Sequence, residues 1–159
     1  MTTVSTPLIA ATPSDREIVI TRTFNAPKAQ VYEGFTSPAL LKHWLAVRGL
    51  VMNRIESDAR VGGRYRFEGA KPGGPTIGWG GEFREIVPGQ LIVQTEAFDG
   101  YPGEAVNTTT FEERDGRTIV TVCLEYPSRE IRDAVLGSGM TDGAGEAYDR
   151  LQALLTGRG

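Results

Sequence analysis

The spacing of hydrophobic residues changes along the chain and divides it into a strand, two helices, a run of strands and a final helix. Glu17–Phe24 is rich in β-branched residues and is typical of a strand. Pro27 predicts the start of a helix, because a proline in the first helical turn costs no hydrogen bond. Val31 and Phe35 lie four residues apart and share one face of that helix. Ser37 predicts the N-cap of a second short helix.

From residue 50 to residue 126 the pattern is one of short strands separated by turns. Six strand candidates with short connections indicate an antiparallel meander. Asp115-Gly116 lies between the last two candidates and is typical of a hairpin turn. The six candidates are Val51–Ser57, Arg64–Glu68, Trp79–Val87, Leu91–Phe98, Ala105–Glu112 and Arg117–Tyr126.

Helical spacing returns after the last strand candidate. Residues 128–136 predict a short helix or a turn, and Thr141 predicts the N-cap of a final helix that ends at Gly157. Glu146 and Arg150 form an i,i+4 pair on the polar side of this helix, opposite an apolar stripe. Because the apolar face of a sheet must be covered, we expect the helix to lie across it. Space left between the two predicts a concave, mostly apolar site.

Length and composition favour a single soluble globular domain. The chain has 159 residues, of which 40% are hydrophobic, and a net charge of −3. These values exclude a wholly disordered chain and argue against a broad basic surface for nucleic acid. We expect one domain over residues 15–156, preceded over residues 1–14 by a flexible arm or a loose edge segment.

The segments and residue types that the sequence lacks limit the cellular compartment and the metal or disulfide chemistry that can be expected. The first fifteen residues have no continuous apolar segment of a secretion signal, and no run is apolar enough for a membrane span, so a cytoplasmic protein is expected. One cysteine and one histidine cannot supply an internal disulfide or a zinc cluster. We therefore expect no metal and no cofactor.

A set of short motifs in a fixed order resembles a known family. The motifs are Arg22–Pro27, then Val31, Thr36, Pro38, Leu41 and Trp44, then Asp58–Phe67, Gly81–Pro88 with Leu91, Thr108–Phe111, Gly116 with Thr118, and finally Met140, Gly143, Tyr148 and Leu151. Over residues 15–155 the chain resembles the SRPBCC superfamily, also called START-like or birch-pollen-allergen-like. Within it, the chain is similar to the branch named for the activator of heat-shock-protein ATPase.

The resemblance implies an α+β helix-grip fold. In such a fold a curved antiparallel sheet wraps around a long C-terminal helix, with two short helices after the first strand. The implied function is binding of a small hydrophobic or aromatic molecule between the helix and the sheet. An enzyme of the polyketide cyclase or dehydratase type and a chaperone-ATPase-activator-like interaction module are the alternatives. The superfamily has no shared catalytic set, so no catalytic residue follows from the resemblance.

Three residue types in the chain are candidates for catalytic groups. His43 directly precedes Trp44 on a helix, so it is expected to face solvent if the tryptophan faces the core. Cys123 is expected to be an inert strand residue, because no base is identifiable beside it. Among five strand glutamates, Glu85 alternates in phase with Phe83 and is the candidate catalytic carboxylate. A solvated or arginine-paired Glu85 is the alternative, and a single β-bulge would reverse its direction.

Aromatic residues are the strongest candidates for ligand contact. They lie on the elements expected to surround the cavity, and tyrosine and tryptophan each add one polar group to an apolar surface. Plain core packing is the alternative for each. The ligand-binding candidates are Trp44, Tyr65, Phe67, Trp79, Phe83, Phe98, Met140 and Tyr148. The expected partner is a small hydrophobic molecule, with no nucleic acid, no membrane span, a monomer or homodimer, and chaperone binding as a further alternative.

Overall fold

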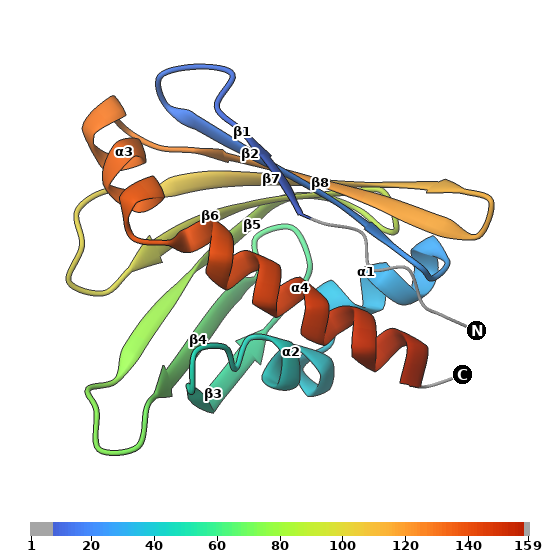
Figure 1. Cartoon of the computed structure of the whole chain (residues 1–159), viewed down its shortest axis with the longest axis horizontal. Helices are drawn as coiled ribbons and strands as arrows, with labels where there is room; N and C mark the ends of the chain where they lie inside the picture. The colour runs from blue at the N-terminus through green and yellow to red at the C-terminus, as the bar shows by residue number, and fades with distance from the viewer. Residues whose placement is uncertain (1–7, 158–159) are drawn as a thin grey trace.

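The computed structural model describes residues 8–157 and shows an eight-stranded antiparallel sheet crossed on one face by the C-terminal helix (Figure 1). The strand order in the sheet is β1-β2-β8-β7-β6-β5-β4-β3. The elements are β1 (Ile9–Ala11), β2 (Glu17–Phe24), α1 (Lys28–Thr36), α2 (Pro38–Trp44), β3 (Val51–Ser57), β4 (Arg64–Ala70), β5 (Ile77–Val87), β6 (Leu91–Phe98), β7 (Ala105–Arg114), β8 (Arg117–Glu125), α3 (Arg129–Gly137) and α4 (Met140–Gly157). This confirms the α+β helix-grip prediction, with all six meander strands in the expected order.

The first strand lies within the segment expected to be an arm or an edge. Ile9–Ala11 pairs antiparallel with Val19–Thr21 and forms the outer edge of the sheet. These three residues therefore form an edge segment, which is one of the two alternatives expected for this part of the chain. Residues 1–7 of the predicted arm lie outside the described residues. The hydrogen bonds of a neighbouring strand order this segment although its own sequence has few strand-forming residues.

The alternation of side chains gives the sheet one buried face. Along β2, Ile18, Ile20, Arg22 and Phe24 are buried, and the residues between them are only half-buried. The β7–β8 hairpin turns at Asp115 and Gly116, whose φ angles of 53° and 77° match the positive values that a two-residue hairpin turn requires. The buried face is the one on which α4 lies (Figure 1).

The two short helices after β2 begin as the prolines predict. Pro27 is the N-cap residue of α1, and Pro38 occupies the first turn of α2. Ser37 is the N-cap residue of α2, but its side chain makes no capping hydrogen bond. The inward side of α1 carries Gly34, which is buried against Leu151 of α4. A small residue is needed here, because a Cβ atom would lie 2.7 Å from the Leu151 side chain.

The C-terminal part forms two helices. Ser128 caps α3 by accepting a hydrogen bond from the Ile131 amide, which decides between the helix and the turn expected there. The final helix begins at Met140, so Thr141 lies inside its first turn and the prediction that Thr141 caps the helix is wrong. Gly139 precedes it with a φ of 82° and provides the sharp change of direction between the two helices. The Glu146–Arg150 ion pair is present at 3.4 Å.

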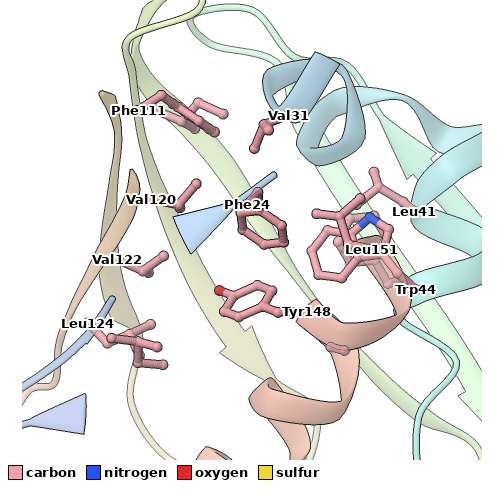
Figure 2. Packing of buried hydrophobic residues seen from close by; sticks show 14 of the residues in the cluster. Phe24, Val31, Leu41, Trp44, Phe111, Val120, Val122, Leu124, Tyr148 and Leu151 are labelled. Carbon is pink, nitrogen blue, oxygen red and sulfur yellow. The ribbon is translucent and has the colours of Figure 1, made fainter. Parts of the chain in front are cut away.

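The second half of α4 packs against the core. Figure 2 shows Leu151 among the side chains of α1, α2 and the sheet, and it is fully buried. Two polar contacts hold the same part of the helix to the end of β2. The buried Arg22 guanidinium pairs with Asp149. The backbone N–H of Asn25 donates a 2.8 Å hydrogen bond to the side-chain Oε1 atom of Gln152. No helix among residues 8–157 is long and apolar enough to cross a bilayer.

Candidate ligand cavity

A cavity of about 620 Å³ lies between the sheet, α3 and the first half of α4. Ligand pockets in proteins commonly measure about 300–1,000 Å³ and are lined mainly by apolar and aromatic side chains. This cavity has the same character. Its lining comes from Ile20, Phe35, Leu41, Trp44, Leu45, Ser57, Tyr65, Phe67, Ile77, Trp79, Phe83, Gln94, Glu96, Phe98, Tyr101, Pro102, Gly103, Ala105, Asn107, Thr109, Val122, Leu124, Tyr126, Pro127, Ile131, Ala134, Val135, Ser138, Met140 and Tyr148.

The structure brings all eight predicted contact residues together around this cavity. Trp44, Tyr65, Phe67, Trp79, Phe83, Phe98, Met140 and Tyr148 all line it. The shared position follows from side-chain alternation: the aromatic residues of β4, β5 and the end of β6 point to the same face of the sheet. Their place in the lining is a property of the fold, and their contact with a ligand is part of the proposal below.

One wall of the cavity is a group of aromatic rings on β4, β5 and β6. The Trp79 and Phe98 rings are stacked, with centroids 5.4 Å apart and an interplanar angle of 20°. Phe67 meets Trp79 edge-on at 5.9 Å, and Tyr65 lies 5.5 Å from Phe83. Rings held at these distances stabilise one another and form a firm apolar surface.

The opposite wall is formed by aromatic residues of the helices. The ring centroids of Trp44 and Tyr148 lie 5.9 Å apart. The Trp44 indole N–H donates a buried hydrogen bond of 2.9 Å to the Gly34 carbonyl. Figure 2 shows the Tyr148 side chain extending from α4, with its hydroxyl directed toward Val122 and Leu124 of β8. The bonded indole fixes the orientation of this wall.

The cavity opens where β5 begins and the β6–β7 loop follows Phe98. Three large apolar lining residues, Ile77, Phe98 and Tyr101, are exposed at this end. Tyr101 is the most exposed, at 76%. Exposed apolar groups at the rim of a cavity are a common feature of entrances for apolar molecules.

The polar part of the cavity is concentrated on β6 and β7. Gln94 and Asn107 are paired in register, and Glu96 lies opposite Ala105, so Glu96 and Asn107 are diagonal neighbours on one face. Glu96 is the one charged side chain in the cavity lining among residues 8–157. Burial raises the pKa of its carboxyl, and a hydrogen bond from Asn107 acts in the opposite direction.

The Glu96 carboxylate also affects the pKa of three tyrosine hydroxyls. Burial is the main cause that raises the pKa of Tyr65, Tyr126 and Tyr148, and the negative charge of Glu96 adds to it in each case. The Tyr65 hydroxyl donates a hydrogen bond to the Thr95 carbonyl. The cavity therefore joins one carboxyl group and several neutral hydroxyl groups inside an apolar surface.

Glu85, the carboxylate selected from the sequence, does not line the cavity, and this prediction is wrong. Its side chain is exposed, because the register between β5 and β6 shifts between Phe83 and Glu85. The bulge places both Arg84 and Glu85 on the outer face, and Ile86 resumes the inner face. The same extra residue keeps Glu85 away from any molecule in the cavity.

The remaining candidate groups lie outside the cavity as expected. His43 is exposed on α2, next to the buried Trp44. Cys123 is half-buried on the outer face of β8, where its thiol donates a 3.1 Å hydrogen bond to Glu17. Burial, followed by the bond and charge of Glu17, raises the pKa of this thiol to about 11. The exposure of His43 agrees with the expectation from the sequence, whereas Cys123 has a carboxylate beside it that the sequence did not reveal.

The alternation of residues along β6 is a sequence signal that Glu96 faces the cavity. On β6, Gln94, Glu96 and Phe98 alternate on one face, and Phe98 was already expected to face the cavity. No bulge interrupts this part of the β6–β7 pairing. Asn107 and Tyr126 were also missed, because a polar residue in a strand and an aromatic residue at a strand end carry no comparable signal.

The fold and the cavity define a helix-grip α+β protein of the SRPBCC superfamily. The family model described as "Activator of Hsp90 ATPase homolog 1-like protein" matches residues 25–156. The chain belongs to this family. A comparison with curated proteins finds no match.

Solved structures with the same fold include two that are at least 30% identical in sequence. A protein from Rhodobacter sphaeroides is 30% identical, with a TM-score of 0.91 over 95% of this chain and 99% of that one. Protein CV1439 from Chromobacterium violaceum is 31% identical, with a TM-score of 0.79 over 89% of this chain and 98% of that one. Protein Ms6760 from Mycobacterium smegmatis is 24% identical, with a TM-score of 0.83 over 94% and 97% of the two chains, and shows the fold alone.

Proposed function

We propose that this protein binds a small hydrophobic or aromatic molecule in the cavity between α4 and the sheet. The observation that carries the proposal is a cavity of about 620 Å³ with two aromatic walls and an apolar rim. Transfer of an apolar molecule from water to such a surface contributes about 25 cal/mol per Å² of apolar area buried. The eight predicted aromatic and methionine residues supply that area, and the tyrosines orient a polar group of the ligand.

Both tryptophans of the chain line the cavity and report directly on its occupancy. The test is a titration with the neutral apolar probe N-phenyl-1-naphthylamine. We expect saturable energy transfer from tryptophan to the bound probe. A linear, non-saturable response would contradict the proposal.

A variant that fills the cavity localises the binding site. Ala105 lines the cavity and Ala97 does not, although both lie on adjacent strands. We expect Ala105→Phe to weaken probe binding at least about tenfold, because the added ring occupies the space beside Glu96. The matched variant Ala97→Phe adds the same ring outside the lining and should leave binding unchanged. Equal binding by both variants would place the probe elsewhere.

A second candidate function is acid–base catalysis on the bound molecule. The observation that favours it is Glu96, a carboxyl group that faces the cavity and whose pKa is raised by burial. A raised pKa allows a carboxyl to donate and recover a proton near neutral pH. Cyclisation or dehydration of a bound substrate requires such a group. The test is mass spectrometry of candidate ligands after incubation with wild type and Glu96→Gln, in which turnover should be lost while binding persists.

Chaperone binding is supported by the description of the family alone. Its test is pull-down with an Hsp90-type chaperone and measurement of the chaperone's ATPase rate. Stimulation by this protein would establish the activity, and it would do so independently of whether the cavity is occupied.

A further inference from the structure

Glu96 and Asn107 both line the cavity, and one acceptor of this pair has no donor among residues 8–157. The Asn107 side chain donates to Glu96, and its own Oδ1 atom is buried with no partner among residues 8–157. Asn107 is only 7% exposed, so bulk water does not reach this oxygen freely. A buried acceptor without a partner is destabilising, because it has lost its hydrogen bonds to water. The pair Glu96 and Asn107 therefore forms a site that a donor group would complete.

No residue between positions 8 and 157 brings a positive charge into the lining of this site. The cavity lining contains no lysine, arginine or histidine among the described residues. Arg22, the arginine buried on the inner face of β2, is outside the lining and is paired with Asp149. An ionised carboxylate in an apolar interior is strongly destabilised unless a cation pairs with it. The missing cation must come from the ligand if Glu96 is ionised in the complex.

A ligand that accepts hydrogen bonds fits this site less well than one that donates them. A carbonyl group could accept a hydrogen bond from a neutral Glu96 or from the Tyr126 and Tyr148 hydroxyls, but it would leave the Asn107 oxygen unpaired. An ammonium group carries several N–H donors and can satisfy the carboxylate and the amide oxygen together. Aromatic rings next to the site add to this preference, because a cation is attracted to the face of a ring within about 6 Å.

We propose that the cavity selects molecules in which a protonated amine is attached to an apolar or aromatic body, with Glu96 as the counter-ion and Asn107 as the second acceptor. This inference rests on the proposed binding function and deepens it. The aromatic walls hold the body of the molecule, and the polar end on β6 and β7 holds the amine. Anionic amphiphiles are repelled by the same carboxylate.

Three probes with one indole body and different charge test the inference by isothermal titration calorimetry at pH 7. They are tryptamine, which is cationic, tryptophol, which is neutral, and indole-3-propionate, which is anionic. We expect tryptamine to bind at least about tenfold more tightly than tryptophol, the size of effect typical of a charge-assisted hydrogen bond. Indole-3-propionate should bind most weakly. Equal affinities for the three would overturn the inference.

Two isosteric variants distinguish the specific effect of the Glu96 charge on tryptamine binding from the effect of removing any negative charge nearby. Glu96→Gln keeps the shape of the side chain, and the ratio of tryptamine to tryptophol affinity should fall close to one. Glu85→Gln removes a charge from the exposed face of the neighbouring strand and should leave the ratio unchanged. A tryptamine preference that survives Glu96→Gln contradicts the role of this carboxylate.

The wild-type protein gives a second measurement that needs no variant. Tryptamine stays protonated in acid, so its preference over tryptophol should disappear as the pH falls and Glu96 takes up a proton. Of the groups near the site, the tyrosines Tyr65, Tyr126 and Tyr148 have raised pKa values and stay neutral throughout this range. Glu104, whose charge reaches Tyr65, is exposed outside the lining, and Glu104→Gln controls for it.

The outcomes separate this inference from the function on which it rests. Saturable binding of N-phenyl-1-naphthylamine without any tryptamine preference supports the cavity function and overturns the amine selectivity. Absence of binding by all probes overturns both. Tryptamine preference that is lost in Ala105→Phe and in Glu96→Gln supports both.

Discussion

The Arg22 guanidinium on the inner face of β2 lies 2.8 Å from the Asp149 carboxylate of α4, and the two side chains are 2% and 64% exposed. The arginine also has a buried Nε atom without a partner among the described residues. A buried cation that loses its one counter-ion is strongly destabilising. Because the buried arginine is destabilised without a counter-ion, its ion pair with Asp149 helps to hold α4 against β2.

We expect Asp149→Ala to lower the free energy of unfolding by about 2–4 kcal/mol, because it leaves a buried guanidinium uncompensated. The measurement is urea unfolding followed by circular dichroism. Arg150→Ala is the matched control, since Arg150 is the next residue of the same helix and pairs with Glu146 at the surface. Its removal should cost less than about 1 kcal/mol. Equal losses in the two variants would show that the burial of Arg22 is immaterial.

A glycine allows β5 and β6 to approach each other closely beside the cavity. A Cβ atom at Gly81 would lie 2.1 Å from the Thr95 carbonyl oxygen, and this oxygen also accepts the hydrogen bond of Tyr65. We expect Gly81→Ala to destabilise the protein by about 1–3 kcal/mol, since the obstacle is backbone that cannot rotate away. Thermal unfolding is the measurement.

The opposite sign is expected for a glycine with free space. No atom lies within 4 Å of a Cβ built at Gly145 in α4. Gly145→Ala should therefore stabilise the protein by about 0.5–1 kcal/mol, because alanine loses less conformational freedom in a helix. The same thermal measurement compares the two variants, and destabilisation by Gly145→Ala would contradict the open surroundings of this residue.

The half-buried carboxyl of Glu96, which lines the cavity, makes stability depend on pH. Its folded pKa is raised above the ordinary value of 4.5, so the folded state holds the proton more firmly than the unfolded chain. The stabilising contribution is complete below pH 4.5 and is lost as the pH rises through the folded pKa. We expect Glu96→Gln, which has no proton to lose, to become progressively more stable relative to wild type as the pH rises above 4.5. Denaturant unfolding across this range measures the difference, and a difference independent of pH would contradict the burial of this carboxyl.

The Cys123 thiol should react slowly with alkylating reagents. Its pKa is raised from the ordinary value of 9.0 to about 11, so the thiolate fraction at pH 8 is about one-hundredth of the usual one. We expect iodoacetamide to modify the native protein at a correspondingly lower rate. Glu17→Gln removes the hydrogen-bonded carboxylate and should accelerate the reaction. An unchanged rate in that variant would assign the low reactivity to burial alone.

The fold and the lining were largely predictable because they depend on periodicity. Alternation of Tyr65 and Phe67 on a polar background fixed the inner face of β4, and the spacing of apolar residues fixed the stripe of the last helix. These patterns place side chains on faces without knowledge of the partner strand. The prediction of the eight contact residues combined the same rule with the cavity that the family resemblance implies.

The choice between two glutamates could not be made with equal success. Glu85 and Glu96 both alternate in phase with a phenylalanine, but only β5 contains a bulge between the two residues. A bulge depends on how one strand pairs with another, and the sequence of a single strand does not encode it. The unpartnered oxygen of Asn107 is likewise a property of side chains brought together from two strands.

The bulge in β5 also determines where this strand can be shortened. Phe83 faces inward, Arg84 and Glu85 both face outward, and Ile86 faces inward again. Loss of Arg84 would restore simple alternation and keep Phe83, Glu85 and Ile86 on their present sides, with Glu85 still opposite Val93. Loss of Glu85 would have the same effect, with Arg84 then opposite Val93, whereas loss of any other interior residue would exchange the two sides for part of the strand. The length of β5 can therefore vary by one residue at position 84 or 85 without a polar side chain entering the cavity.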